Sequence, residues 1–197
     1  MTVEEFKSKY SKRLIVKKIW DWGWHKYVTT GVLTQSGGLI NDIWKPVVTS
    51  IKQQVTSVLI LGLATGTLAN IIAKKYKGVK VTGVEIDPVM IEIGKKYFEL
   101  DKIPNLKIVN IDANKYKFEK VDLILVDLYL GDTPPKFIYT EKFLKKLRKF
   151  GTTVVINHLF YDPQKKAKAE MLIKKMGKYF KNIKLQRVLT NVMIICE

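Results

Sequence analysis

The stretch from residue 58 to residue 88 constrains the fold more than any other part of this sequence. It starts as the apolar run 58–61, passes through the glycine-bearing turn 62–67 and a short helical pattern, and ends in a second apolar run that stops at Glu85. Glycines let a backbone come close to a ligand, and an acid at a strand end can accept hydrogen bonds from both hydroxyls of a ribose. The stretch therefore predicts a βαβ unit whose carboxyl edge holds a nucleoside.

The remainder of the chain from residue 55 repeats this alternation of strand and helix. Predicted strands cover residues 57–61, 80–85, 106–110, 121–127 and 152–157, and predicted helices cover 67–76, 88–98, 140–149 and 163–180. Several of the strands are continuous apolar runs, which is typical of a parallel sheet covered on both faces. Two further strands, 183–189 and 192–196, lie so close together that they predict an antiparallel hairpin at the sheet edge. We therefore expect an α/β, doubly wound domain with a mostly parallel seven-stranded sheet and a C-terminal antiparallel hairpin.

Residues 1–54 predict a short N-terminal β/α extension on the substrate side of a cofactor domain formed by residues 55–197. Residues 1–8 are expected to be a helical or frayed start, and 13–19 and 26–33 to be the strands of a hairpin around an aromatic bend. A turn is expected at 35–38. A helix over 41–51 follows, with Asn41 or Asp42 as its cap.

The 197 residues carry a formal net charge of +17, from 35 basic and 18 acidic residues. Such a charge attracts phosphate, so a nucleic-acid partner is one interpretation. The lysines are spread along the whole sequence, however, and the only arginines, whose planar fork suits nucleic acids, are Arg13, Arg148 and Arg187. A solvated lysine surface is therefore the favoured interpretation, with nucleic acid as the alternative.

Several classes of protein are excluded by what the sequence lacks. No apolar run approaches the roughly 20 residues of a membrane span, and residues 1–10 lack the apolar centre of a secretory signal. Cys196 is the only cysteine, which excludes an internal disulfide and a cysteine-based zinc site, and no metal-ligand spacing occurs. We therefore expect a cytoplasmic location, no membrane contact and no metal.

Chemistry-bearing residues follow four successive predicted strands. The turn after the first strand holds Gly62 and Gly66, the second strand ends at Glu85, Asp112 follows the third, and Asp127 ends the fourth. The turn has neither the Gly-x-Gly-x-x-Gly pattern of a dinucleotide site nor the Lys-Ser/Thr of a phosphate loop, so the usual pyrophosphate cradle is incomplete. Because open α/β sheets bind ligands at the carboxyl ends of their strands, the joint spacing predicts one site there.

These motifs resemble those of the class I S-adenosylmethionine-dependent transferases, most closely the spermidine-synthase-like branch. The resemblance rests on the glycine motif, the ribose-binding motif, an adenine-flanking pair and the stretch from the catalytic aspartate onward, at residues 62–66, 84–88, 112–113 and 127–143. Upstream, residues 31–35 and Trp44 are similar to the family's Asp-Gly-Val turn, its cofactor-contacting glutamine and a later aromatic residue.

The resemblance implies a Rossmann-like fold and a cofactor that is S-adenosylmethionine or its decarboxylated form. It implies cofactor contacts at the motif positions, namely Gln35, Gly62, Ala64, Thr65, Gly66, Glu85, Ile86, Asp112, Ala113 and Asp127. Asp127 is also the implied catalytic residue, and Tyr129, Asp132 and His158 are candidate contacts to the substrate. Family members commonly dimerise, so a homodimer is a candidate assembly.

The reaction is predicted from two departures from the family pattern. In the synthases a carboxylate lies inside the glycine motif and a second aspartate follows the catalytic one by three residues, whereas this chain has Thr65 and Leu130 there. Both departures remove negative charge from where a diamine would bind. We therefore expect methyl transfer to a small-molecule acceptor, with Asp127 as a positioning group or general base. Aminopropyl transfer to a polyamine is the first alternative, and a nucleic-acid-binding protein on the same fold with little catalysis is the second.

The tryptophans and His158 allow two interpretations each. The four tryptophans either stack on a planar substrate or, as we prefer, form a small hydrophobic cluster or dimer contact; they are Trp20, Trp22, Trp24 and Trp44. His158 follows a predicted strand near the active edge, so a contact to the substrate and a structural role are both open.

Overall fold

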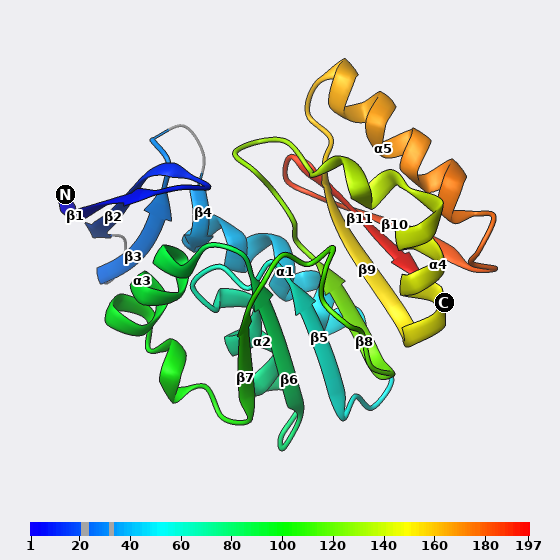
Figure 1. The fold of residues 1–197 in the computed structure, drawn as a ribbon, viewed down its shortest axis with the longest axis horizontal. Helices are drawn as coiled ribbons and strands as arrows, with labels where there is room; N and C mark the ends of the chain where they lie inside the picture. The colour runs from blue at the N-terminus through cyan, green and yellow to red at the C-terminus, as the bar shows by residue number, and fades with distance from the viewer. Residues whose placement is uncertain (21–23, 32–33) are drawn as a thin grey trace.

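The computed structural model describes residues 1–20, 24–31 and 34–197, and within them it contains two β-sheets (Figure 1). In the described residues the larger sheet has seven strands, in the order β10-β11-β9-β8-β5-β6-β7. They are β5 (Ser57–Leu61), β6 (Lys80–Glu85), β7 (Leu106–Asn110), β8 (Val121–Val126), β9 (Gly151–Leu159), β10 (Ile183–Val188) and β11 (Asn191–Cys196). Strands β5 to β9 run parallel, and β10 and β11 form an antiparallel hairpin on β9. The predicted α/β fold class is confirmed.

Helices cover both faces of this sheet because its strands are apolar on both faces. Along β5, Val58 and Ile60 pack into one core cluster, whereas Leu59 and Leu61 pack into another. The first cluster includes residues of α1 (Gly38–Ser50), α2 (Thr67–Lys75) and α3 (Pro88–Phe98), and the second includes residues of α4 (Glu141–Phe150) and α5 (Pro163–Met176). The short 3₁₀ helices η1 and η2 cover Leu100–Lys102 and Lys136–Tyr139.

The strand order fixes where a ligand can bind. From β5 the chain continues to β6 and β7 on one side, and it then crosses to β8 and β9 on the other side. The order therefore reverses between β5 and β8, and in doubly wound folds the crevice for the ligand lies at the carboxyl ends of the strands at such a reversal. Gly62 and Asp127 come directly after these two strands.

The N-terminal residues form a second sheet, which is antiparallel and has the order β1-β2-β3-β4. Its strands are β1 (Thr2–Ser8), β2 (Lys12–Trp20), β3 (Trp24–Thr29) and β4 (Thr34–Gly37). The pairing of β2 with β3 confirms the predicted hairpin, but the helical or frayed start predicted for residues 1–8 is wrong. Pairing with β2 makes this segment a strand because it turns Phe6 onto a core cluster that contains Leu14 and Val16.

The turn predicted at residues 35–38 is also wrong, because β4 runs to Gly37 and α1 starts at Gly38. Gly37 has a φ of +79°, and a Cβ there would lie 2.5 Å from the carbonyl oxygen of Lys26 on β3. Glycine therefore lets the strand pass directly into the helix. Neither Asn41 nor Asp42 caps α1, since the N-cap is Gly37 and it makes no side-chain cap bond.

Some of the predicted elements include residues that the structure does not describe. Trp22 and Gly23 of the predicted aromatic bend, and Val32 and Leu33 of the 31–35 motif, lie outside the described residues. The division of the chain at residue 55 stays a prediction. In the described ranges no helix has the length and apolar character that crossing a membrane requires. Cys196 is buried in β11, and burial raises the pKa of its thiol to about 12.

Candidate functional site

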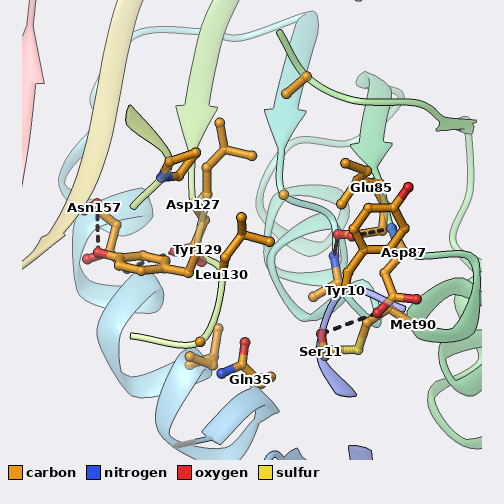
Figure 2. A pocket seen from close by; sticks show the side chains of 18 of the residues that line it. Tyr10, Ser11, Gln35, Glu85, Asp87, Met90, Asp127, Tyr129, Leu130 and Asn157 are labelled. Carbon is orange, nitrogen blue, oxygen red and sulfur yellow. Dashed lines mark hydrogen bonds between the residues drawn. The ribbon is translucent and has the colours of Figure 1, made fainter. Parts of the chain in front are cut away.

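A pocket of about 320 Å³ opens at the carboxyl ends of β5, β6, β7 and β8. Figure 2 shows that its labelled residues form two groups, with Glu85, Asp87 and Tyr10 in one and Asp127 and Leu130 in the other. We call the side of the first group the cofactor end; Ser11, Met90 and Asp112 also belong to it. We call the side of the second group the acceptor end; Tyr129 and Asn157 also belong to it. Gln35 lines the same pocket.

The glycine turn brings the backbone of β5 against the end of β8. Gly62 has a φ of +91°, and a Cβ there would lie 2.1 Å from the carbonyl oxygen of Asp127, so no other residue fits without displacing β8. The amide of Gly62 donates to the carbonyl oxygen of Val84 at 2.9 Å. The turn is thereby held between the ends of β6 and β8, where Gly62 and Ala64 both line the pocket.

Glu85 is the acid at the end of β6 and is 9% exposed. One of its carboxylate oxygens accepts from the backbone N–H of Ala64 at 2.8 Å, and the other accepts from the backbone N–H of Asp87 at 2.9 Å. Burial raises the pKa of Glu85, and these two backbone hydrogen bonds oppose the shift. The carboxylate is therefore aimed by the backbone of two turns, with its remaining lone pairs facing the pocket.

Asp87 caps α3, and it also ties the N-terminal sheet to the pocket. Its side chain accepts from the backbone N–H of Val89 at 3.0 Å and from the hydroxyls of Ser8 and Ser11. The turn between β1 and β2 is thereby held over the cofactor end, and Tyr10 and Ser11 line it. The sequence carries no motif that indicates these two contacts.

Asp112, Ala113 and Ile111 follow β7 and complete the cofactor end. The side chain of Asp112 accepts from the backbone N–H of Asn114 at 2.8 Å, which closes a turn that fixes the carboxylate. Ala113 is 5% exposed. The pocket therefore has a small apolar side chain next to a carboxylate, an arrangement that suits a planar base with an exocyclic amino group.

Asp127 is held by two side-chain donors at the acceptor end. Its Oδ2 accepts from the indole N–H of Trp44 at 2.8 Å, and its Oδ1 accepts from the amide of Asn157 at 2.9 Å. Burial raises the pKa of the Asp127 carboxyl, and the two hydrogen bonds oppose the shift. Asn157 is itself fixed, because its side-chain oxygen accepts from Asn191 at 2.7 Å and its backbone oxygen accepts from the hydroxyl of Tyr129 at 3.0 Å.

Most of the predicted site residues meet in this pocket, but four do not. The pocket is lined by Gln35, Gly62, Ala64, Glu85, Ile86, Asp112, Ala113, Asp127 and Tyr129, as the sequence predicts. Thr65 and Gly66 line a separate cavity of about 520 Å³ beside α1 and α2. Thr65 is 1% exposed and its hydroxyl bonds to Ser36, so it faces β4 rather than the cofactor end.

His158 and Asp132 are the other two predicted residues that do not line the pocket. His158 is fully buried; its Nδ1 lies 2.7 Å from the carbonyl oxygen of Leu159, and its Nε2 lies 2.8 Å from the hydroxyl of Tyr139. Because a carbonyl only accepts, Nδ1 carries the proton and Nε2 accepts from Tyr139. Burial lowers the pKa of His158, so the imidazole is a neutral support behind the acceptor end.

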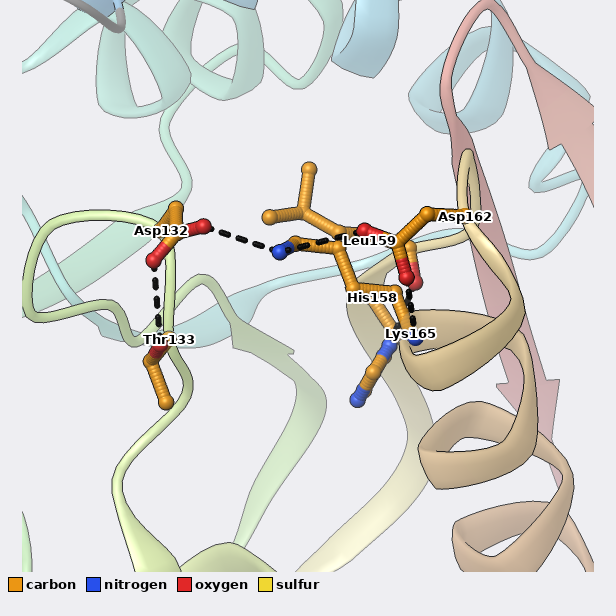
Figure 3. A network of polar contacts seen from close by, with 6 residues as sticks. All are labelled: Asp132, Thr133, His158, Leu159, Asp162 and Lys165. Carbon is orange, nitrogen blue, oxygen red and sulfur yellow. Dashed lines mark hydrogen bonds and ion pairs between the residues drawn. The ribbon is translucent and has the colours of Figure 1, made fainter.

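Asp132 belongs to a polar network that anchors the loop after β8 (Figure 3). Its carboxylate pairs with Lys165 of α5 at 2.8 Å, and Lys165 also lies 3.4 Å from Asp162, the cap of that helix. The hydrogen bond to Asp132 raises the pKa of Lys165. The loop that carries Leu130 is thereby attached to the start of α5.

The predicted tryptophan cluster is wrong for Trp44. Trp20 and Trp24 pack edge to face with ring centroids 5.4 Å apart and are 67% and 57% exposed, whereas Trp44 is fully buried in α1 and donates to Asp127. Its position among the motif residues is the sequence signal that could have assigned it to the site.

The charges around the pocket are all of one sign. Four acids line it, and among the described lining residues there is no lysine, arginine or histidine; the acids are Glu85, Asp87, Asp112 and Asp127. On a chain with 35 basic and 18 acidic residues this is a local reversal of charge. In the part of the chain that the structure describes, no group of three His, Cys, Asp or Glu residues could hold a metal.

Known proteins match this chain in sequence over about half of its length. Residues 58–151 match a family described as a methyltransferase domain. A polyamine aminopropyltransferase from Vibrio vulnificus is 32% identical over 98 residues, which cover 47% of this chain and 33% of the relative. The matched part thus spans about a third of that relative's length.

Solved structures match nearly the whole chain in fold. A spermidine synthase from Thermotoga maritima has a TM-score of 0.76 at 18% identity, covering 99% of this chain and 72% of that one. The human methyltransferase-like protein 13, in complex with SAH, has a TM-score of 0.61 at 18% identity, covering 80% of this chain and 78% of that one. Residues 58–151 are therefore similar to a methyltransferase domain, and the fold of the chain is Rossmann-like and similar to that of a spermidine synthase.

Proposed function

We propose that this protein transfers an alkyl group from a sulfonium nucleoside to a small amine, and that the group is aminopropyl, donated by decarboxylated S-adenosylmethionine. The observation that carries the proposal is the pocket lined by four acids and no base. Both forms of the cofactor carry a positively charged sulfonium and an ammonium, but the decarboxylated form lacks the carboxylate that a basic residue would pair with. Buried charges are unfavourable unless they are paired, so this lining favours the more cationic ligand.

The residues at the cofactor end fit a nucleoside. Glu85 would accept from the ribose hydroxyls, since its carboxylate is already aimed by two backbone N–H groups. Asp112 would accept from the adenine amino group, with Ala113 and Ile86 against the ring. The turn at Gly62 lets the backbone approach the ligand without a side chain in between.

Asp127 would handle the amine. Each of its oxygens has accepted one hydrogen bond, so each has a lone pair left for an ammonium or amine of the acceptor. Its raised pKa makes it a better base than an exposed aspartate. The amine nitrogen then forms a bond to the sulfonium-bound carbon while the carbon–sulfur bond breaks, its electron pair stays on sulfur, and the proton leaves nitrogen for Asp127 or solvent. Holding the two reactants in line supplies most of the catalysis.

The relatives support the aminopropyl version. The matched curated relative is a polyamine aminopropyltransferase, and the likeness to a spermidine synthase covers 99% of the chain, against 80% for the human methyltransferase-like protein. The four acids that line the pocket also show that the net charge of +17 is not the charge at the site.

Methyl transfer is the second candidate, and two side chains favour it. Leu130 lines the acceptor end three residues after Asp127, and Thr65 is turned toward Ser36. Neither supplies the carboxylate that the synthases have at the corresponding positions, so the aminopropyl ammonium of the decarboxylated cofactor would rely on Asp127 alone.

Calorimetric titration with S-adenosylmethionine and, separately, with its decarboxylated form tests the proposal. Tighter binding of the decarboxylated form supports aminopropyl transfer, and tighter binding of the carboxylated form moves the assignment to methyl transfer. We expect Asp127→Asn to lower the transfer rate by roughly 10²- to 10⁴-fold, whereas Asp101→Asn, at an exposed position, should leave it unchanged. Binding of neither form would contradict the proposal and favour the nucleic-acid alternative, for which affinity should fall steeply with salt.

A further inference from the structure

The pocket is also lined by apolar side chains from three separate segments. They are Leu39, Ile40 and Ile43 of α1, Leu130 and Phe137 after β8, and Leu159 at the end of β9. The hydrogen bond between Trp44 and Asp127 brings α1 against this part of the pocket. Leu39 and Leu130 are 45% and 51% exposed, so they present apolar surface to the pocket that no other part of the described chain covers.

The negative charge at this end is limited to one group. Among the described lining residues, Asp127 is the acid at the acceptor end, whereas Glu85 and Asp87 lie at the cofactor end (Figure 2). Asp132 does not line the pocket, and its carboxylate is already paired with Lys165. The acceptor end therefore offers one carboxylate for a cationic head group, and apolar side chains line the pocket beside it.

We propose that the acceptor is a monoamine with an apolar body, and not a diamine. This inference rests on the proposed function, because it takes the amine head to lie at Asp127. The described lining offers no second carboxylate at the acceptor end, so a second ammonium on the acceptor would have no ion-pair partner there, and an unpaired buried charge is strongly unfavourable. A methyl group in the same place would instead bury apolar surface. Leu130 is thus the residue that determines specificity, since it is an exposed apolar side chain of the pocket that lies three residues after Asp127 in the chain.

The matched pair of n-pentylamine and 1,4-diaminobutane isolates this choice, because the two differ only in a terminal methyl group against a terminal ammonium. Their binding is measured by calorimetry on the full chain saturated with methylthioadenosine or S-adenosylhomocysteine, which cannot react. We expect pentylamine to bind at least about tenfold more tightly than the diamine. Equal affinities, a preference for the diamine, or binding of neither amine would overturn the inference.

The variant Leu130→Asp should reverse the preference, because it places a second carboxylate opposite the distal ammonium. Leu185→Asp is the matched control, since Leu185 is 50% exposed on β10 and does not line the pocket, and it should keep the preference of the original chain. An unchanged preference in Leu130→Asp would also contradict the inference. If neither nucleoside binds, the proposed function itself is contradicted. A failure of the proposed function is therefore distinguishable from a failure of this inference.

Discussion

The cofactor end and the acceptor end of one pocket are built in different ways. At the cofactor end, Glu85 is the last residue of β6 and Asp112 lies two residues after β7, and both are aimed by backbone N–H groups of adjacent turns. At the acceptor end, Asp127 is held by side chains of Trp44 and Asn157, which come from a helix and from another strand. The position of the acids at the cofactor end is therefore fixed by the strand order. The contacts that hold the acid at the acceptor end can change with single side chains while the fold is kept.

Glu85→Ala should break the cofactor end and have the largest effect. The substitution removes the carboxylate that the proposal assigns to the ribose, so we expect nucleoside affinity to fall by about 1.5–3 kcal/mol, or roughly 10- to 150-fold. Calorimetry with S-adenosylhomocysteine measures this change, with Glu92→Ala on the exposed face of α3 as the control. Unchanged affinity in Glu85→Ala would show that the ribose is held elsewhere.

His158→Gln should remove one acid-sensitive group from behind the acceptor end. Burial lowers the pKa of His158, so the unfolded chain, where a histidine has a pKa of about 6.5, binds the proton more strongly than the folded chain. The stability that neutral His158 contributes is therefore present above about pH 6.5 and is lost as the pH falls toward the lowered folded value. Urea unfolding at pH 8 and pH 5 should show a smaller acid-induced loss in His158→Gln.

The control for this measurement is His25→Gln, because His25 is an exposed histidine of β3. It should retain the full loss of stability in acid. At pH 8, His158→Gln is expected to be less stable by about 1–3 kcal/mol, since the hydroxyl of Tyr139 loses its buried partner. An acid response equal to that of the original chain would mean that other groups carry it.

Lys165→Gln should have the smallest effect and should be confined to the acceptor end. Asp132 is about half exposed, so its ion pair with Lys165 is worth less than about 1 kcal/mol, and that contribution should decrease with salt. We expect amine affinity to fall by no more than about fivefold, with nucleoside affinity unchanged. An equal loss of both affinities would mean that the loop after β8 serves the cofactor end as well.

The predictability of the site follows the same division. Glu85, Asp112 and Asp127 are predictable because strand ends in a parallel sheet meet at one edge. The Thr65 side chain faces β4 because its hydroxyl bonds to Ser36. The sequence predicts a turn at Ser36 rather than a strand, so the glycine motif alone wrongly places Thr65 in the pocket. Tyr10 and Ser11 escape prediction because they enter the site through a sheet whose first strand has no strong period in the sequence.

The position of Trp44 shows why helices are harder to place than strands. Its type and its place near the motifs are visible in the sequence, but its contact with Asp127 depends on where α1 starts, and α1 begins at Gly38 rather than at residue 41. The predicted helix 41–51 also contains Trp44, but the side chain that it meets is set by how the helix packs against the sheet, which the sequence pattern does not give. The hydrogen bond between Trp44 and Asp127 is therefore not predictable from the sequence pattern.

The single buried cysteine makes this chain a ready scaffold for optical reporters. Because burial raises the pKa of the Cys196 thiol to about 12, little of it is thiolate at neutral pH, and thiol-reactive dyes react with the thiolate. A cysteine introduced at Ile111, an exposed position that lines the pocket, would thus be labelled selectively without first removing the native one. A fluorophore there would record ligand arrival in real time.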